Sequence, residues 1–343
     1  MDEQRYDVVV IGGGAAGLSA ALVLGRARRR VAVIDAGSPR NAPAAQMHGF
    51  LSRDGMPPRE LLATGRAEVA RYGVAVVEDA VVGIDPGFVV RLAGGRRLRA
   101  RRVVTGEAVS ARAEDGGFVV RLADGQEVRS RRLLVTTGLV DELPDLPGLR
   151  ERWGHDVLHC PYCHGWEVRD QPLGVLGTIA GSVQHALLVR QWSEDVVFFA
   201  HTYALTDDER AQLDARGIRV EPGPVARLVV EDDRLRGVEL GDGRVVARSA
   251  VFVRPGNAAH RDGLLAGLGC EVDEAGFAVV DPTGRTTVAG VWAAGNVVDP
   301  RAQVITAAGA GSAVAIAVNA DLVREDVELA VRRAQAAPVH AAV

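Results

Sequence analysis

The sequence predicts an α/β protein with two three-layer (ββα) dinucleotide-binding domains, the second inserted in the first. Two strand, glycine turn, helix and strand units support this prediction, one at residues 6–37 and one at residues 172–199. A later strand-to-helix turn near Gly295 indicates that the C-terminal part returns to the first domain. A chain of 343 residues has room for about two domains.

The first unit has the features of a Rossmann-like dinucleotide site. An apolar run at Val8–Ile11 reads as a buried strand, and the turn Gly12-x-Gly14-x-x-Gly17 then opens an apolar helix. Glycines there allow a tight turn, close approach of the backbone to a pyrophosphate, and close helix packing. The next strand ends in Asp35, 18 residues past Gly17, where a carboxylate would accept from ribose hydroxyls. The loop alone does not distinguish NAD from FAD.

The second unit lacks the middle glycine of such a turn. Ile179 occupies the position where the backbone must approach a pyrophosphate, and a β-branched side chain there takes the space of the phosphates. The stretch after the following strand has no arginine for a 2′-phosphate until Arg210, and it carries the acids Asp207 and Asp208. We therefore expect a nicotinamide-type module that no longer binds nicotinamide; the alternative is an unusual loop that still binds NADH.

An internal duplication lies within the first domain. Residues 87–103 and 117–133 match at 11 of 17 positions, and each copy has the alternation and glycine turn of a β-hairpin. We expect the extra copy to lengthen a β-meander, and residues 219–256 predict a similar hairpin in the second domain.

These patterns set the expected domain boundaries. The first domain would comprise residues 1–140 and 257–325, the inserted domain residues 141–256, and a C-terminal tail residues 326–343.

Composition narrows the possible partners and location. A net charge of −4 and aromatic residues at 4% argue against nucleic acid as a partner. We expect no apolar run of the ~18 residues that span a bilayer, and therefore no membrane contact. The acidic start MDEQ does not resemble a signal peptide, which predicts a cytoplasmic protein.

The stretch HCPYCHGWE (residues 159–167) holds two of the three cysteines of the chain, Cys160 and Cys163. In a cytoplasmic protein, Cys-x-x-Cys is more often catalytic or metal-binding than a structural disulfide. Zinc could draw on His159 and His164 as well, but a structural zinc site needs a second ligand pair nearby, and Cys270 stands alone. We therefore predict a redox-active pair and no metal, a buried small apolar role for Cys270, and no catalytic role for His159.

With this pair placed between the Thr137-Gly138 turn and the strand at residue 172, nearly the whole chain resembles the low-molecular-weight thioredoxin reductase family. CPYCHGWE is most similar to the branch of dithiol oxidases that close disulfides in natural products such as gliotoxin and holomycin. The resemblance implies FAD as cofactor, a homodimer, and either a small-molecule dithiol or disulfide or a thioredoxin-like protein as substrate, with O2 as acceptor in the oxidase branch.

The resemblance also implies which residues bind FAD. They lie in the first glycine turn, at the end of the second strand and in the loop after it, in the Thr-Gly turn, and at the late turn with its helix: Gly12, Gly14, Ala15, Ala16, Gly17, Asp35, Ala36, Arg40, Asn41, His48, Thr137, Gly138, Gly295, Asn296, Gln303 and Val304.

By the same resemblance, Cys163 faces the flavin and Cys160 meets the substrate sulfur. Thioredoxin reductases have an aspartate after the second cysteine, whereas this chain has His164, which suits proton removal from a substrate thiol near neutral pH. This favours oxidation of a dithiol. The alternatives are an NADPH-dependent thioredoxin reductase, a flavin redox sensor without turnover, and a His164 that is merely solvated. Tyr162 and Trp166 either line the substrate site or, for Trp166 equally, pack in the core.

Overall fold

The computed structural model describes residues 5–80, 104–114, 117–122, 127–259 and 263–336. The chain divides into two compact units, and each is described by itself. The first unit comprises Met1–Pro39, Leu61–Val140 and Ala258–Val343, and the inserted unit comprises Arg40–Glu60 and Asp141–Asn257. The segment Arg40–Glu60 was expected in the first domain, but it packs with the inserted unit, where its side chains find ion-pair partners.

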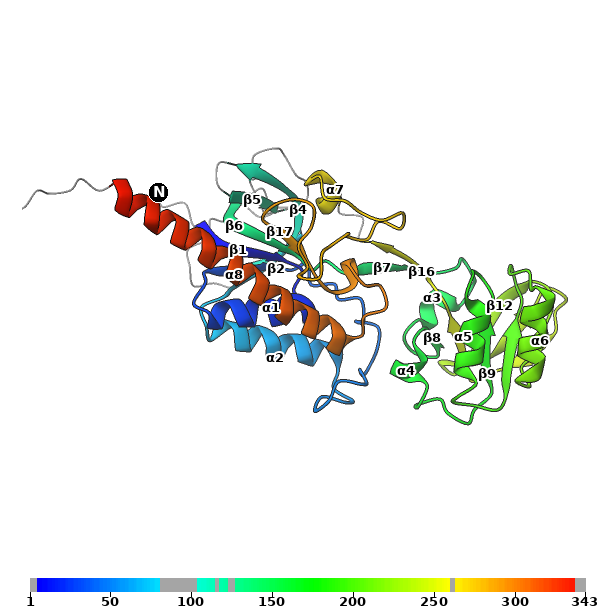
Figure 1. The fold of residues 1–343 in the computed structure, drawn as a ribbon. Helices are drawn as coiled ribbons and strands as arrows, with labels where there is room; N and C mark the ends of the chain where they lie inside the picture. Colours follow the sequence, from blue (N-terminus) through cyan, green and yellow to red (C-terminus); the bar gives the residue numbers. More distant parts are fainter. Residues whose placement is uncertain (1–4, 81–103, 115–116, 123–126, 260–262, 337–343) are drawn as a thin grey trace, which may run out of the picture. The chain divides into compact units, whose positions relative to one another are not determined.

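The first unit is built on a sheet of seven strands (Figure 1). Parallel pairing joins six of them to neighbours: β1 (Arg5–Ile11), β2 (Val31–Ile34), β3 (Ala75–Ala80), β4 (Val104–Glu114), β6 (Glu127–Val135) and β17 (Val291–Ala293). Ile11 lies opposite both Ile34 and Val135, and Val135 lies opposite Ala293. This register brings the carboxyl ends of β2, β1, β6 and β17 to one edge of the sheet, where ligands bind in open α/β sheets.

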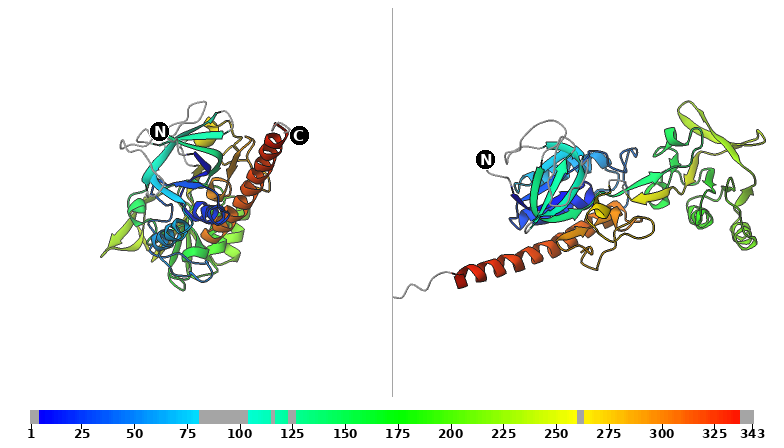
Figure 2. Two further views of the ribbon diagram at one scale, coloured as in Figure 1. Left: turned by 90° about the vertical axis from the view of Figure 1, so that its left-hand side faces the viewer. Right: turned by 90° about the horizontal axis from the view of Figure 1, so that it is seen from above.

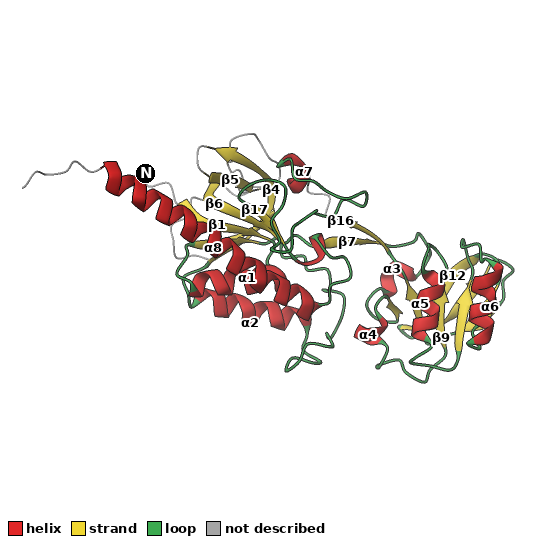
Figure 3. Cartoon of the chain, viewed as in Figure 1, coloured by secondary structure: helices red, strands yellow, loops and turns green. Residues whose placement is uncertain are grey.

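Helices cover one face of this sheet and an antiparallel layer covers the other (Figure 3). The helices are α1 (Ala15–Arg26), α2 (Pro58–Ala70) and α8 (Val304–Ala336). On the other side, β5 (Gly117–Leu122) pairs antiparallel with both β4 and β6. A short helix, α7 (Leu264–Gly267), joins the core on the antiparallel side. The predicted three-layer architecture is therefore confirmed for this unit.

The inserted unit repeats this plan. A parallel sheet runs in the order β11 (Arg219–Glu221), β10 (Val196–Phe199), β9 (Leu173–Leu176), β15 (Ala250–Val253), β8 (Val157–Leu158). Helices α5 (Ser182–Val189) and α6 (Asp207–Ala215) cover one face, and the antiparallel strands β12 (Val225–Glu231), β13 (Arg234–Leu240) and β14 (Val245–Ala247) cover the other. The chain enters and leaves through β7 (Leu139–Glu142) and β16 (Gly256–Ala259), which pair with each other.

The described residues include one of the two copies of the duplicated hairpin. Residues 87–103 lie outside the described residues. The second copy forms the hairpin β5–β6, as predicted, and β6 continues beyond it as a central parallel strand.

Helix α8 corrects the expected tail, because it continues without a break to Ala336 rather than ending near residue 325. Ion pairs hold its middle turns on the first unit: Arg131 contacts Glu325 and Asp326, and Arg29 also contacts Asp326. In Figure 2 its last turns extend past the sheet.

Among the described residues, α8 is also the one helix long and apolar enough to cross a bilayer, judged by length and composition alone. The expectation that no segment would pass this test was wrong, because no charged residue occurs between Val304 and Ala320. One face of α8 (Val314, Ala315, Val318 and Leu322) is buried in the core with α1.

Candidate active site

The first glycine turn lies at the ligand-binding edge of the first sheet. A side chain at Gly12 (φ 106°) would place its Cβ 2.3 Å from the carbonyl oxygen of Thr136, and one at Gly17 would lie 1.9 Å from the carbonyl oxygen of Gly12. Both positions therefore need glycine for the fold. A Cβ at Gly14 would meet nothing within 4 Å. Gly14 thus leaves an open space at the start of α1, as a pyrophosphate would need.

Asp35 stands at the end of β2, as predicted, and its two oxygens are engaged. Oδ1 accepts from the backbone N–H of Gly13 at 3.1 Å, and Oδ2 forms an ion pair with Arg66 on α2. A Cβ at Gly13 would lie 2.6 Å from the Asp35 side chain. Sequence reasoning missed Gly13 and Arg66, although the run of three consecutive glycines was a signal for Gly13.

Thr136 is a further residue that sequence reasoning missed. Its hydroxyl lies 2.9 Å from the carbonyl oxygen of Ile11 and 2.8 Å from that of Gly12, so it holds the glycine turn against β6. The residues named from the sequence, Thr137 and Gly138, follow it, and Gly138 has a positive φ of 80°. The preceding threonine of the TTG sequence was the available signal.

The late turn closes the same edge. Gly295 has a φ of 79°, and a Cβ there would lie 3.0 Å from the Cβ of Ala16. The side-chain amide of Asn296 donates to the carbonyl oxygens of Asp299 and Ala302, at 2.9 Å each, which fixes the loop before Gln303. Helix α8 begins at Val304, next to the position expected from the sequence.

These residues fit a dinucleotide with a pyrophosphate. Ala15 begins α1, neither α1 nor α8 has an acidic residue in its first turn, and Ala36 directly follows the ribose-side carboxylate Asp35. The positive ends of both helix dipoles are therefore left for a negatively charged ligand.

In the inserted unit, Cys160 and Cys163 form a disulfide, with their Cα atoms 5.2 Å apart. Cys160 is the N-cap of the short helix α4 (Pro161–His164), and the N–H groups of Cys163 and His164 both donate to its carbonyl oxygen at 3.1 Å. Gly165 allows the tight packing of this segment, since a Cβ there would lie 2.8 Å from the Trp192 ring. Both sulfurs are thus used by the disulfide. The third cysteine, Cys270, is buried as predicted, and burial raises the pKa of its thiol.

Three histidines lie around this disulfide. Burial lowers the pKa of His164. The neighbouring Glu167 carboxylate raises this pKa, but the effect of burial is larger. Burial and the charge of Arg40 lower the pKa of His159 to about 4, and burial likewise lowers the pKa of His185 to about 4. All three imidazoles are therefore neutral at neutral pH and can accept a proton.

Residues 6–312 match the model of the pyridine nucleotide-disulphide oxidoreductase family. The chain belongs to this family. FAD is accordingly the dinucleotide of the first unit, and the enzyme class is a thiol–disulfide oxidoreductase of thioredoxin reductase-like fold.

Several relatives cover nearly the whole chain. "Thioredoxin reductase sirT" of Leptosphaeria maculans is 31% identical over 92% of this chain and 93% of its own length. The solved structure titled "Crystal structure of HlmI" is 57% identical with a TM-score of 0.83 and covers 96% of each chain. An oxidoreductase from Agrobacterium tumefaciens is 35% identical with a TM-score of 0.81, covering 93% of this chain and 99% of its own.

Three residues expected to bind FAD belong to the inserted unit: Arg40, Asn41 and His48. Arg40 forms a bidentate ion pair with Asp141, at 2.8 and 2.6 Å. His48 lies 3.4 Å from Asp54 and 3.4 Å from Glu167. Asn41 belongs to the same segment. The nearby carboxylates hold the side chains of Arg40 and His48 in this segment, and their contact with FAD stays a prediction.

Two aromatic side chains beside the disulfide are exposed to solvent. Tyr162 is 64% exposed and packs edge-on to Trp192, whereas Trp166 is 65% exposed and carries the Arg169 guanidinium 4.0 Å above its ring. The core-packing interpretation of Trp166 was therefore wrong, and both rings are available to a substrate.

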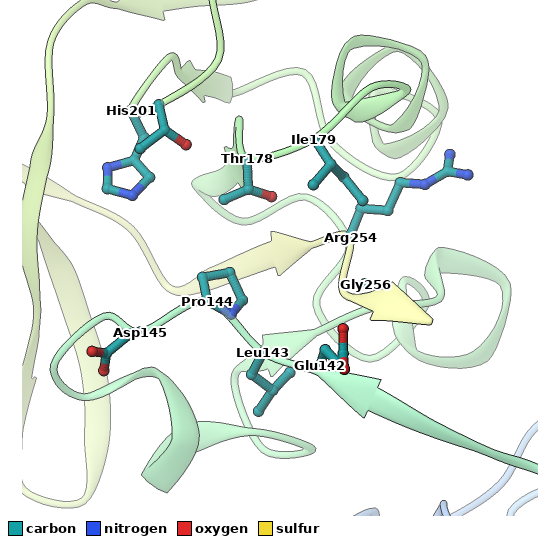
Figure 4. A pocket seen from close by; sticks show the side chains of 10 residues that line it. Glu142, Leu143, Pro144, Asp145, Thr178, Ile179, His201, Arg254 and Gly256 are labelled. Atoms are coloured by element: carbon teal, nitrogen blue, oxygen red, sulfur yellow. The ribbon is translucent and has the colours of Figure 1, made fainter. Parts of the chain in front are cut away.

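The second glycine turn borders a cavity of about 420 Å³ (Figure 4). Ile179 is partly exposed in its wall, and the Ser182 hydroxyl donates to the Ile179 carbonyl oxygen at 2.7 Å. The acids that follow β10 have a structural use, because Asp207 and Asp208 lie in the first turn of α6, where the helix dipole favours negative charge. The cavity is lined by Glu142, Leu143, Pro144, Asp145, Thr178, Ile179, His201, Thr202, Arg254 and Gly256.

Proposed function

We propose that this flavoprotein oxidises a small-molecule dithiol to a disulfide, with O2 as the final acceptor. The observation that carries the proposal is the Cys160–Cys163 disulfide at the start of α4, beside histidines that are neutral at neutral pH. A base of this kind can take the proton of a substrate thiol, and the thiolate is the species that attacks a disulfide.

In the proposed reaction, a substrate thiolate attacks Sγ of Cys160, the Cys160–Cys163 bond breaks, and Cys163 leaves as a thiolate. The second substrate thiol then attacks the mixed disulfide, which closes the substrate disulfide and releases Cys160. His164 takes the proton of the attacking thiol. FAD, when bound, accepts two electrons from the cysteine pair and passes them to O2, so that the products are the substrate disulfide and hydrogen peroxide.

The direction of the reaction is supported by the second glycine turn. Ile179 stands where a pyrophosphate would approach the backbone, and the acids after β10 serve the start of α6. Without a hydride donor bound in this unit, electrons enter through the cysteines. The exposed Tyr162 and Trp166 favour a small apolar substrate over a charged one.

Anaerobic reduction of the flavin tests this proposal. We expect a small dithiol to bleach the purified yellow protein within one turnover, and NADPH at micromolar concentration to leave it oxidised. Readmitting O2 should restore the flavin colour and produce one peroxide per dithiol oxidised. Fast bleaching by NADPH would instead identify a thioredoxin reductase, and bleaching by neither reagent would identify a redox sensor.

We also infer a homodimer that works in the cytoplasm. An exposed stripe runs along α8 on the side away from α1, and we call it the α8 stripe: Ile305, Gly309, Ala313, Ile316, Ala320, Val323, Val327 and Val331. A helix that is apolar on two opposite faces normally buries both. A second copy fits this stripe, because an antiparallel pair about a two-fold axis presents the same residues from both sides.

A further inference from the structure

His185 is a buried histidine that the proposed reaction leaves unused. It lies on α5 and is 8% exposed. Its Nε2 lies 2.8 Å from the backbone carbonyl oxygen of His159, 26 residues earlier. Because a carbonyl can only accept, Nε2 carries the proton and Nδ1 does not.

The carbonyl that His185 holds belongs to the residue directly before Cys160. Strand β8 ends at Leu158, which lies opposite Phe252 of β15, and α4 begins at Pro161. His159 and Cys160 therefore form the two-residue connection between the sheet and the helix start. The ring of His185 contacts two other rings edge-on. Its centroid lies 6.0 Å from that of Phe252 and 6.1 Å from that of His159.

The environment of the other ring nitrogen indicates that the His185 side chain has a role beyond packing. Nδ1 of His185 is buried and has no hydrogen-bond partner among the described residues. An unpartnered buried nitrogen is unfavourable, and a leucine or phenylalanine would fill the volume without it. The N–H donated to His159 is the contribution that an apolar side chain lacks.

We propose that His185 is a positioning residue for the disulfide: its Nε2–H anchors the His159 carbonyl and thereby fixes the backbone that presents Cys160. This deepens the proposed function, since it concerns the same disulfide. The anchor joins α5, at the second glycine turn, to the redox-active segment. A module that has lost the middle glycine of its turn thus uses the following helix to support the cysteine pair.

The test measures the disulfide directly, so it does not depend on turnover or on the natural substrate. The rate of reduction of Cys160–Cys163 by dithiothreitol is followed in the FAD-loaded protein under argon, where no O2 can reoxidise the pair, by trapping free thiols. We expect His185→Leu to slow reduction about five-fold, the equivalent of one net hydrogen bond. His185→Gln, whose amide can donate to the same carbonyl, should restore the rate to within about two-fold of wild type.

Val189→Ala is the matched control, because Val189 is fully buried one turn along the same helix and makes no contact of this kind. It should lower stability and leave the reduction rate unchanged. Equal rates in His185→Leu and wild type, or a His185→Gln rate as slow as that of His185→Leu, would overturn the proposal. If His185→Leu does not fold, His185→Asn replaces it, since its shorter amide cannot reach the carbonyl, and equal rates in the Asn and Gln variants would then refute the anchor.

A spectroscopic measurement checks the tautomer itself. The ¹⁵N shifts of His185 should report an Nε2–H imidazole without titration between about pH 5 and pH 8. An Nδ1–H tautomer would be incompatible with the hydrogen bond and with the proposal.

Discussion

Gly14 and Gly17 differ in what a side chain would meet at each position. At Gly17 a Cβ would overlap the Gly12 carbonyl oxygen, whereas at Gly14 it would enter open space. Gly17 serves the packing of helix on strand, and Gly14 serves the ligand. The same distinction separates Thr136, which holds the turn through its hydroxyl, from Gly138, whose positive φ shapes the chain after it.

Gly14→Val should therefore yield a folded protein without FAD. Gly14 has φ −75° and ψ −170°, values that valine adopts without strain, so only the cofactor space is filled. The measurement is the ratio of flavin to protein absorbance after purification, together with the thermal unfolding temperature. Gly17→Val is the comparison, and it should fail to fold. A Gly14→Val protein that retains full flavin absorbance would show that the pyrophosphate lies elsewhere.

The two histidines that flank the cysteine pair can be separated by pH. A histidine base works only when neutral, so the reaction rate should fall as pH drops below the pKa of the base. Burial lowers the pKa of both side chains, that of His159 to about 4 and that of His164 below its usual value.

If His164 is the base, the rate of dithiol oxidation should fall as the pH drops below about 6.5 in wild type, because burial lowers the pKa of this imidazole. The His164→Gln variant should lose this pH dependence and be about 100-fold slower. The His159→Gln variant should keep the pH dependence. A fall in rate centred near pH 4 that disappears in His159→Gln would instead identify His159 as the base.

The second glycine turn shows how one element can lose a ligand and keep its fold. Gly177 still packs against β10, since a Cβ there would lie 2.8 Å from the Ala200 carbonyl oxygen, and Gly181 keeps a positive φ of 85°. Helix α6 also has a complete capping box, in which Thr206 and Glu209 bind each other's backbone N–H groups. The helix and strand around Ile179 are thus intact, and the position facing the cavity has changed.

Ile179→Gly should consequently allow some binding of NADH. Affinity should remain low, because one bidentate arginine–phosphate contact contributes roughly 1.5–3 kcal/mol, or about ten- to a hundredfold in binding, and no arginine follows β10 until Arg210. Titration calorimetry measures the affinity for NADH and NADPH in each variant.

In the Ile179→Gly background, Thr202→Arg with Tyr203→Arg should raise the affinity for NADPH toward that for NADH. Tyr203→Phe is the control for losing the hydrogen bond that the Tyr203 hydroxyl donates to Glu209 at 2.7 Å. Tight NADH binding by wild type would contradict the interpretation of this turn.

Across the entire chain, α8 joins distant parts of the first unit. Its buried face packs on α1, Gly311 lies so close to Ala16 that a Cβ would be 2.0 Å from the Ala16 carbonyl oxygen, and Asp321 pairs with Arg132 and Arg285. The opposite face is the α8 stripe. Helix α8 is therefore held on the first unit by its buried face and its ion pairs, and its second apolar face remains exposed.

Ile316→Arg should convert the proposed dimer to a monomer. Ile316 is the most exposed large apolar side chain of the α8 stripe, and a charge there would be buried without a partner at a two-fold contact. Light scattering coupled to size-exclusion chromatography measures the mass. Gln335→Arg, exposed on the same helix outside the α8 stripe, should leave it unchanged. A wild-type monomer, or an Ile316→Arg dimer, would rule out this interface.

Much of the fold and part of the site follow from contiguous residues. The glycine turns, the strand that ends in Asp35, the Cys160–Cys163 spacing and the late turn at Gly295 are each encoded within about one strand–turn–helix unit. Periodicity and turn chemistry act over a few residues, so these features could be predicted, and the two-domain plan followed from their order along the chain.

Packing between distant segments decided the rest. Arg66 reaches Asp35 from 31 residues away, Arg40 pairs with Asp141, and His185 reaches the carbonyl of His159. No local pattern marks such pairs, because their free energy comes from which elements the folded chain brings together. The end of α8 is of the same kind: residues 326–336 read as a tail, and ion pairs from β6 and from the turn after α1 hold the turn at Asp326 in place.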